Sequence, residues 1–402
     1  MIRRATLLVR RLFTVDPAAL APSGKRDLRL DFFRGLALWF IFLDHIPSNL
    51  VNWITLRNYG FSDAAEIFIF ISGYSASIAY GGTMRRSGFR LAAARVLRRC
   101  WQLYVAHIFL FVIFTAQIAY VATRFNNPLF AEEMQIVDFL NNPPATLVQA
   151  LLLKFRPANL DILPLYIVLL LVFPLVLWGL ERRPLWVVAA SAFLYGVVQA
   201  THINLPGYPP GEGWFFNPLA WQFLFILGAL LGRLHGSVEP VLPHDRALLG
   251  AALAYLAFAF IVALSWHIPQ LEPLVPHWLA DIIYPISKTD LDPLRLLHFL
   301  ALAYVTIWFV GAEARFLAWR VSRLPIWCGQ QSLYTFCASI VLSFSGHFFL
   351  IEVDDSFAAQ VAVSAIGIAF MIALAYVLGW YRRAEIMELA GRRPGTRPLP
   401  RA

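Results

Sequence analysis

The stretch from Leu30 to His45 reads LDFFRGLALWFIFLDH, an apolar segment with an arginine near one end and an Asp-His pair at the other. Ten residues separate Arg34 from His45. Because eleven steps of 100° return a helix to nearly the same azimuth, both side chains share one face, roughly 16 Å apart along the axis. Asp31 and Leu38 lie on that face too. Polar groups are costly in lipid, so we expect this face to border a continuous protein-lined path.

The composition indicates an integral membrane protein. Of 402 residues, 59% are hydrophobic and only 14% are charged, far from the average of soluble domains. Apolar stretches long enough to cross a bilayer recur along the chain, which predicts an all-α, polytopic bundle of about ten transmembrane helices. The expected spans are 30–46, 64–80, 101–121, 162–180, 185–200, 218–234, 247–266, 296–310, 326–350 and 357–380.

The basic residues predict the orientation, since Lys and Arg near span ends are retained in the cytoplasm. Most of the 33 Lys and Arg fall in alternate links and in the two terminal segments, so we expect both termini to be cytoplasmic. We predict a basic tail at 1–28, a transmembrane domain at 29–383 and a disordered Pro/Arg-rich tail at 384–402. The net charge of +9 then reflects topology and anionic lipid, and gives no case for nucleic acid. The three cysteines have neither disulfide nor zinc spacing, and no metal is implied.

Polar residues at the span ends form two predicted groups. The group at the outer depth offers aromatic rings and hydrogen-bonding groups suited to sugar hydroxyls. The inner group is rich in arginine, whose planar fork suits phosphate and carboxylate ligands. The outer residues are Asp44, His45, Asp63, Glu66, Asp161, Tyr166, Asn217, Trp221, Gln222, Asp292, Arg295 and His298, and the inner ones include Arg34, Arg85, Arg86, Arg90, Arg95, Arg98 and Arg99.

Each feature also has a purely structural interpretation. The inner arginine cluster follows from the positive-inside rule alone. Arg34 can extend to the interface or pair with Asp31, and His45 can cap its helix. Trp221 and Tyr166 can belong to the aromatic belt at the membrane surface.

Three segments together resemble a known family. Leu30-Asp-Phe-Phe-Arg34-Gly with His45 following, then Glu66-Ile-Phe-Ile-Phe-Ile-Ser72-Gly73-Tyr, then Arg95-Val-Leu-Arg-Arg99 resemble the acyltransferase-3 superfamily of membrane proteins. Within it the chain is most similar to the OpgC family, which succinylates osmoregulated periplasmic glucans. One departure is Cys100-Trp-Gln102, where the superfamily pattern has prolines. The blocks around Asp161, Asn217 and Gln330 resemble later parts of the OpgC pattern, over about 26–380.

The resemblance implies a membrane O-acyltransferase that moves a succinyl or related acyl group from cytoplasmic acyl-coenzyme A to a periplasmic glucan. His45 would be the general base, oriented by Asp44 or Glu66. Donor binding would involve Arg34, Arg95, Arg99, Ser72 and Gly73, and acceptor binding would involve Asp161, Tyr166, Asn217, Trp221, Gln222, Arg295 and His298. Arg295 or Lys288 would meet the succinyl carboxylate. We expect a bacterial inner-membrane location and association with glucan-synthesis proteins.

Two other functions fit the same polar groups. A transporter of a carbohydrate or anionic metabolite would also have many spans and an intramembrane arginine such as Arg34, although no inverted repeat is evident. A non-catalytic partner in a glucan-synthesis complex would keep the fold without the chemistry. Release of free coenzyme thiol by the purified protein separates the enzyme from both alternatives.

Overall fold

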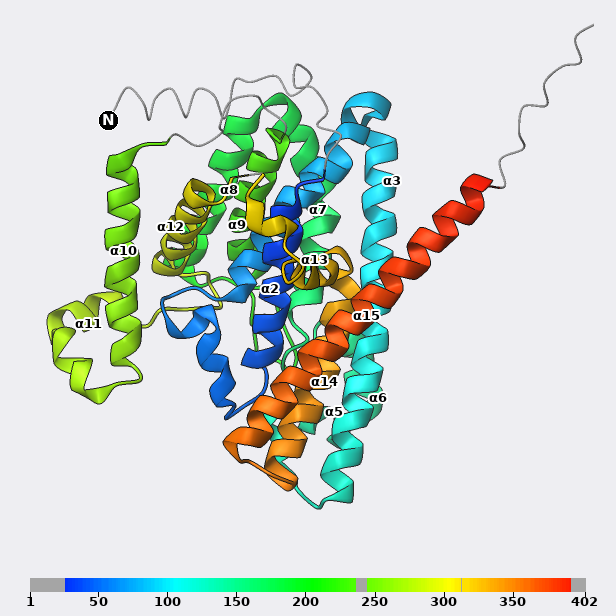
Figure 1. The fold of residues 1–402 in the computed structure, drawn as a ribbon, viewed down its shortest axis with the longest axis vertical. Helices are drawn as coiled ribbons and strands as arrows, with labels where there is room; N and C mark the ends of the chain where they lie inside the picture. Colours follow the sequence, from blue (N-terminus) through cyan, green and yellow to red (C-terminus); the bar gives the residue numbers. More distant parts are fainter. Residues whose placement is uncertain (1–25, 236–243, 312, 392–402) are drawn as a thin grey trace, which may run out of the picture.

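The computed structural model describes residues 26–235, 244–311 and 313–391 (Figure 1). The described residues form helices without a β-strand, which confirms the all-α prediction. The longer helices are α2 (Leu28–Asp44), α3 (Ala64–Arg124), α7 (Ile162–Arg182), α8 (Pro184–Thr201), α9 (Pro218–Arg233), α10 (Arg246–Ser265), α12 (Pro293–Phe309), α14 (Ser332–Glu352) and α15 (Phe357–Gly391). Short helices lie between them: η2 (Leu50–Ile54), η3 (Leu56–Asn58), α4 (Leu129–Glu133), α5 (Val137–Asn141), α6 (Pro143–Leu151), η4 (Pro269–Leu274), α11 (His277–Ile283), η5 (Arg315–Ala318) and α13 (Arg323–Gln330).

Six described helices are long and apolar enough to cross a membrane: α3, α7, α8, α10, α14 and α15. Two further apolar helices, α9 and α12, are shorter. The count of ten spans and the cytoplasmic termini stay predictions. The predicted tail at 1–28 lies almost wholly outside the described residues, whereas 384–391 of the predicted disordered tail are helical and continue α15.

Helix α3 joins two predicted spans, 64–80 and 101–121. It begins at Ala64 with a capping box: the Asp63 side chain accepts from the Ala65 N–H, and Glu66 accepts from the Asp63 N–H. Its 61 residues are broken only at Gly88, whose φ of 79° lies in the region open to glycine. Figure 1 shows the two legs of α3 meeting at the top of the view.

The first leg of α3 packs directly on α9 because both helices carry glycine at the contact. A Cβ on Gly73 would lie 2.0 Å from the Phe225 carbonyl oxygen, and one on Gly228 would lie 2.2 Å from that of Phe70. Small residues allow this backbone approach, which is typical of helix contacts in membranes. Gly73, predicted to bind the donor, therefore lies in a helix contact.

The predicted span 326–350 is two helices in the structure. Gln331, at φ −109° and ψ 35°, separates α13 from α14. Both helices pack against α2, together with α3 and α15.

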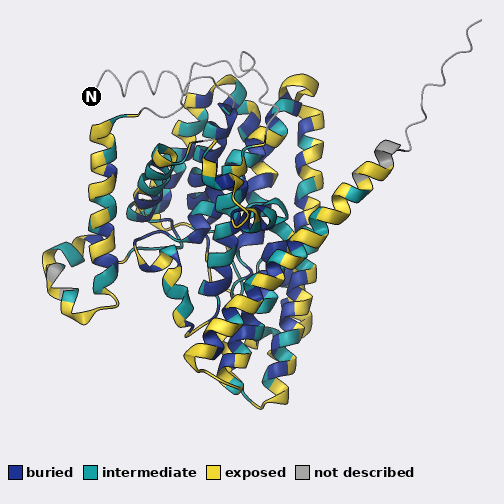
Figure 2. Cartoon of the chain, viewed as in Figure 1, coloured by how far each residue is buried: buried dark blue, intermediate teal, exposed yellow. Residues whose placement is uncertain are grey.

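Helix α2 lies at the centre of this packing. Figure 2 shows buried residues along α2, whereas α10 and α15 expose most of their surface. Asp31, Leu38 and Ile41 of the predicted stripe are buried. The polar face of α2 is thus turned toward protein, as its spacing predicts.

Candidate active site

A large cavity, of about 1210 Å³, lies where α2 ends and α3 begins. We call it the His45 cavity. Residues from 57–62, 132–138, 155–161, 204–216 and 286–289 contribute to its wall, together with Trp266, His267, Arg295 and Phe336. Of the residues predicted to act in catalysis or acceptor binding, four line it: Asp44, His45, Asp161 and Arg295. Asp63, which belongs to the same outer polar group, lines it as well.

His45 has the properties of a proton acceptor. It follows the last residue of α2, and its N–H donates to the Ile41 carbonyl at 3.1 Å. Its Nδ1 is buried and has no hydrogen-bond partner among the described residues. A neutral imidazole nitrogen without a partner can accept a proton.

Neither predicted orienting acid forms a hydrogen bond with the His45 ring among the described residues. The Asp44 carboxylate instead accepts from the Thr55 hydroxyl at 2.7 Å. Glu66 is fully buried and accepts from Arg295 Nε at 2.9 Å.

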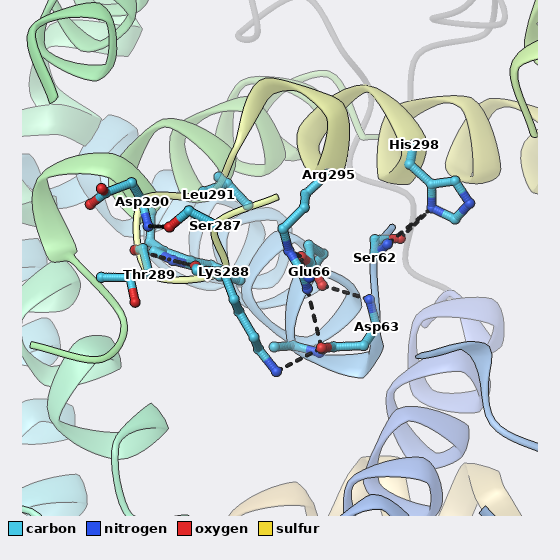
Figure 3. A network of polar contacts seen from close by, with 12 residues as sticks. Ser62, Asp63, Glu66, Ser287, Lys288, Thr289, Asp290, Leu291, Arg295 and His298 are labelled. Atoms are coloured by element: carbon cyan, nitrogen blue, oxygen red, sulfur yellow. Dashed lines mark hydrogen bonds and ion pairs between the residues drawn. The ribbon is translucent and has the colours of Figure 1, made fainter. Parts of the chain in front are cut away.

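Glu66 belongs to a four-residue ion network that joins α3, α12 and the loop before α12 (Figure 3). Asp63 Oδ2 lies 2.6 Å from Lys288 Nζ and 3.1 Å from Arg295 Nη2, which is also 2.7 Å from Glu66 Oε1. Burial alone would raise the pKa of Asp63, but the charges of Lys288 and Arg295 outweigh burial and hold it below its ordinary value. Two acids balance two bases, so Arg295 is neutralised within the protein.

Four other predicted acceptor residues are engaged within the protein, outside the cavity wall. Asn217 bonds Asp290 at 2.9 Å, and Trp221 Nε1 donates to the Lys288 carbonyl at 3.1 Å. The remaining two are Gln222, which bonds Ser191 at 2.6 Å, and His298, which bonds Ser62 at 2.7 Å. These contacts fix the loop before α12 and the packing of α8 on α9.

A second, smaller cavity of about 170 Å³ surrounds Arg34, and we call it the Arg34 cavity. The guanidinium group of Arg34 donates a hydrogen bond to Ser75 Oγ at 2.5 Å, and it lies 3.9 Å from the Asp31 carboxylate. The other polar residues that line it are Ser72, Tyr80, Arg99, Tyr166 and Ser332. The structure thus brings together three predicted donor residues and moves Tyr166 from the acceptor group to this cavity.

Arg95 does not line the Arg34 cavity, because its guanidinium donates to the buried hydroxyl of Thr83. Arg99, four residues further along α3, does line it and donates to the Gln102 side chain at 3.3 Å. The two arginines therefore differ in access to a ligand at Arg34.

The two cavities are separate, with Phe336 in the wall of both. Phe336 lies in the first turn of α14 and is 1% exposed. Its ring packs on Phe68 with centroids 6.2 Å apart. On α2, Leu38 is fully buried between Arg34 and His45. The predicted continuous path from Arg34 to His45 is therefore closed in this structure.

Several residues of the His45 cavity were not singled out from the sequence. Trp214 lies under the Arg156 guanidinium at 4.2 Å, and Arg156 pairs with Asp161 at 3.0 Å. Arg57 lines the cavity beside His45. The loops that carry these residues have no periodic sequence pattern. The one sequence feature that could have indicated Arg57 is its position as a cation in the short link between the first two predicted spans. Among the described residues, no group of three His, Cys, Asp or Glu is placed to hold a metal ion.

Comparison with protein families matches residues 26–383 to the family described as OpgC protein. That range contains all residues of both cavities. Comparisons with curated proteins and with solved structures gave no match. Together with the six apolar helices, the family match indicates a multi-pass membrane acyltransferase that modifies a glucan.

Proposed function

Because this chain belongs to the OpgC family, we propose that it transfers a succinyl group from cytoplasmic succinyl-coenzyme A to hydroxyl groups of a periplasmic glucan, in the bacterial inner membrane. The observation that carries the proposal is His45, whose Nδ1 has no hydrogen-bond partner among the described residues and whose side chain lies in the wall of a large polar cavity. Acyl transfer to a hydroxyl needs such a base.

In the proposed step, His45 removes the proton of a glucan hydroxyl while that oxygen attacks the thioester carbonyl carbon. The new C–O bond forms, and the C–S bond breaks. The protonated imidazole then returns the proton to the departing sulfur, which gives free coenzyme thiol and a glucan ester. No oxidant, reductant or metal takes part in this balance.

The His45 cavity suits a glucan acceptor. Its volume of about 1210 Å³ exceeds the range of roughly 300–1,000 Å³ typical of small-ligand pockets, so it can hold more than one sugar unit. Tyr208, Trp214 and Trp266 line it and offer apolar ring faces, while Glu132 and Asp138 offer acceptors for hydroxyl hydrogens.

The Arg34 cavity suits an anionic part of the donor. Two guanidinium groups, Arg34 and Arg99, and the hydroxyls of Ser72 and Ser75 converge on it. Charge-assisted hydrogen bonds of this kind favour phosphate oxygens. The volume of about 170 Å³ accommodates only part of a coenzyme, so the rest would lie beyond this cavity. Acyl transfer requires the Phe336 ring to move, because it separates the donor at Arg34 from the base at His45.

Full-length protein in detergent, given succinyl-coenzyme A and a short glucan, tests this function. We expect wild-type protein to release free coenzyme thiol and His45→Ala to lose roughly 1,000-fold or more of the rate. His277→Ala is the matched control, since His277 is exposed in α11 and does not line the cavity. A fully active His45→Ala protein would remove the histidine from the chemistry.

A transporter is the second candidate, and one observation favours it. Two polar cavities separated by one aromatic side chain also suit a carrier that opens to each side in turn. A carrier moves its ligand intact, so wild-type protein would release no coenzyme thiol in the same assay.

A further inference from the structure

Cations in the His45 cavity differ in whether the protein neutralises them. Arg156, Lys288 and Arg295 each have a carboxylate oxygen within 3.0 Å of a side-chain nitrogen. Arg57, the remaining cation in this wall, has no carboxylate within ion-pair distance in the described part of the chain. Its charge is thus available to a ligand.

The backbone that carries Arg57 is held on both sides, in η3. Thr55 is fully buried and donates to the Asp44 carboxylate at 2.7 Å. Asn58 is buried and donates to the Asn52 carbonyl at 2.8 Å. The Arg57 side chain between them is exposed, so its backbone is fixed while its guanidinium group is accessible.

The Arg57 guanidinium group lies next to the backbone of the candidate base, His45. Arg57 Nη1 is 3.3 Å from the carbonyl oxygen of Asp44, the residue that precedes His45. This is its one hydrogen bond within the described residues, so most of the five guanidinium donors remain for a ligand.

We propose that Arg57 binds the free carboxylate of a dicarboxylic acyl group, and so selects the acyl donor; this inference rests on the proposed acyl transfer at His45. A guanidinium fork matches a carboxylate with two parallel hydrogen bonds. A short acyl chain with its thioester carbon at His45 places its far end at the neighbouring wall. Arg295 and Lys288, which the sequence favoured for this role, are bonded to Asp63 and Glu66 instead.

Comparing two acyl donors of equal chain length isolates the contribution of the carboxylate to donor selection. Succinyl-coenzyme A carries the carboxylate, and butyryl-coenzyme A has a methyl group in its place. We measure kcat/KM for both donors with a short glucan, in wild-type protein, Arg57→Gln and Arg57→Lys. Arg124→Gln is the matched control, because Arg124 is exposed, has no ion pair in the described structure and does not line the cavity.

We expect wild-type protein to prefer succinyl-coenzyme A, and Arg57→Gln to reduce that preference roughly 30-fold or more, since a site built for a charged group rejects the analogue that lacks it. Butyryl transfer should be unchanged or faster, Arg57→Lys should retain part of the preference, and Arg124→Gln should retain all of it. If Arg57→Gln lowered kcat/KM equally for both donors, or left the preference unchanged, the role of Arg57 would be overturned. The proposed acyl transfer itself would still stand. Absence of thiol release from either donor in wild-type protein would overturn the proposed function and, with it, this inference.

Discussion

The His45 and Arg34 cavities differ in size and in the state of their charges. The His45 cavity is about 1210 Å³, and most of its cations are neutralised by acids of the protein. The Arg34 cavity is about 170 Å³, and within the described residues its two arginines have only Asp31, at 3.9 Å from Arg34, within ion-pair distance. A wide cavity whose cations are mostly paired suits a neutral polymer, and a narrow one with excess positive charge suits an anion. In the proposed function, the acceptor would therefore bind in the His45 cavity and the anionic donor in the Arg34 cavity.

The largest effect is expected from a substitution that removes one partner of the ion network in the His45 cavity. Arg295→Met leaves Glu66 buried without its cation, and we expect the free energy of unfolding to fall by about 3–5 kcal/mol. Denaturant unfolding in detergent measures this change. Combining it with Glu66→Gln should recover much of the loss, because no unpaired charge remains. The exposed Arg320→Met should change stability by less than about 0.5 kcal/mol, and a similar loss in that control would contradict the assignment.

The next effect concerns the excess charge of the Arg34 cavity. Arg34→Gln removes a charge-assisted contact, so we expect donor affinity to fall roughly 30-fold, with Arg34→Lys in between. Titration of succinyl-coenzyme A into the protein without acceptor measures the affinity, and a thermal scan checks that the variant is folded. Normal donor binding by a folded Arg34→Gln protein would remove Arg34 from the donor site.

Phe336 tests how the two cavities communicate. Phe336→Trp adds bulk to the wall that both cavities share, and this larger ring must move for transfer to occur, so we expect the transfer rate to fall about tenfold, which corresponds to roughly 1.4 kcal/mol in the activation free energy. Donor affinity should be unchanged, whereas Phe336→Leu should stay within a few-fold of wild type. Phe349→Trp, on an exposed part of the same helix, is the control. Equal slowing in both tryptophan variants would show that Phe336 has no special place between the cavities.

Helical periodicity predicted the parts of the site that depend on depth along a helix. The spacing from Asp31 to His45 put these residues on one face of α2, and that face is buried. Span ends placed Asp44, Asp63 and Asp161 at one depth, and all three line one cavity.

Periodicity could not predict where each side chain points across the bundle. Tyr166 lies five residues after Asp161, which is roughly 7.5 Å deeper and about 140° around the helix, so it faces the Arg34 cavity. Asn217 and Trp221 bond the loop before α12, whose path no local pattern specifies. Gly73 was selected for its motif, but its lack of a side chain serves contact with α9.

The aromatic wall between the two cavities has a consequence for the proton gradient across the membrane. A water-filled channel from one face to the other would let protons run down their gradient, because chains of water and ionisable groups conduct them. With Phe336 between the cavities, the proposed donor and acceptor would lie on opposite sides of one aromatic ring, and no open water channel would connect the two faces. In the proposed reaction the same ring would keep bulk water from the thioester and so limit its hydrolysis.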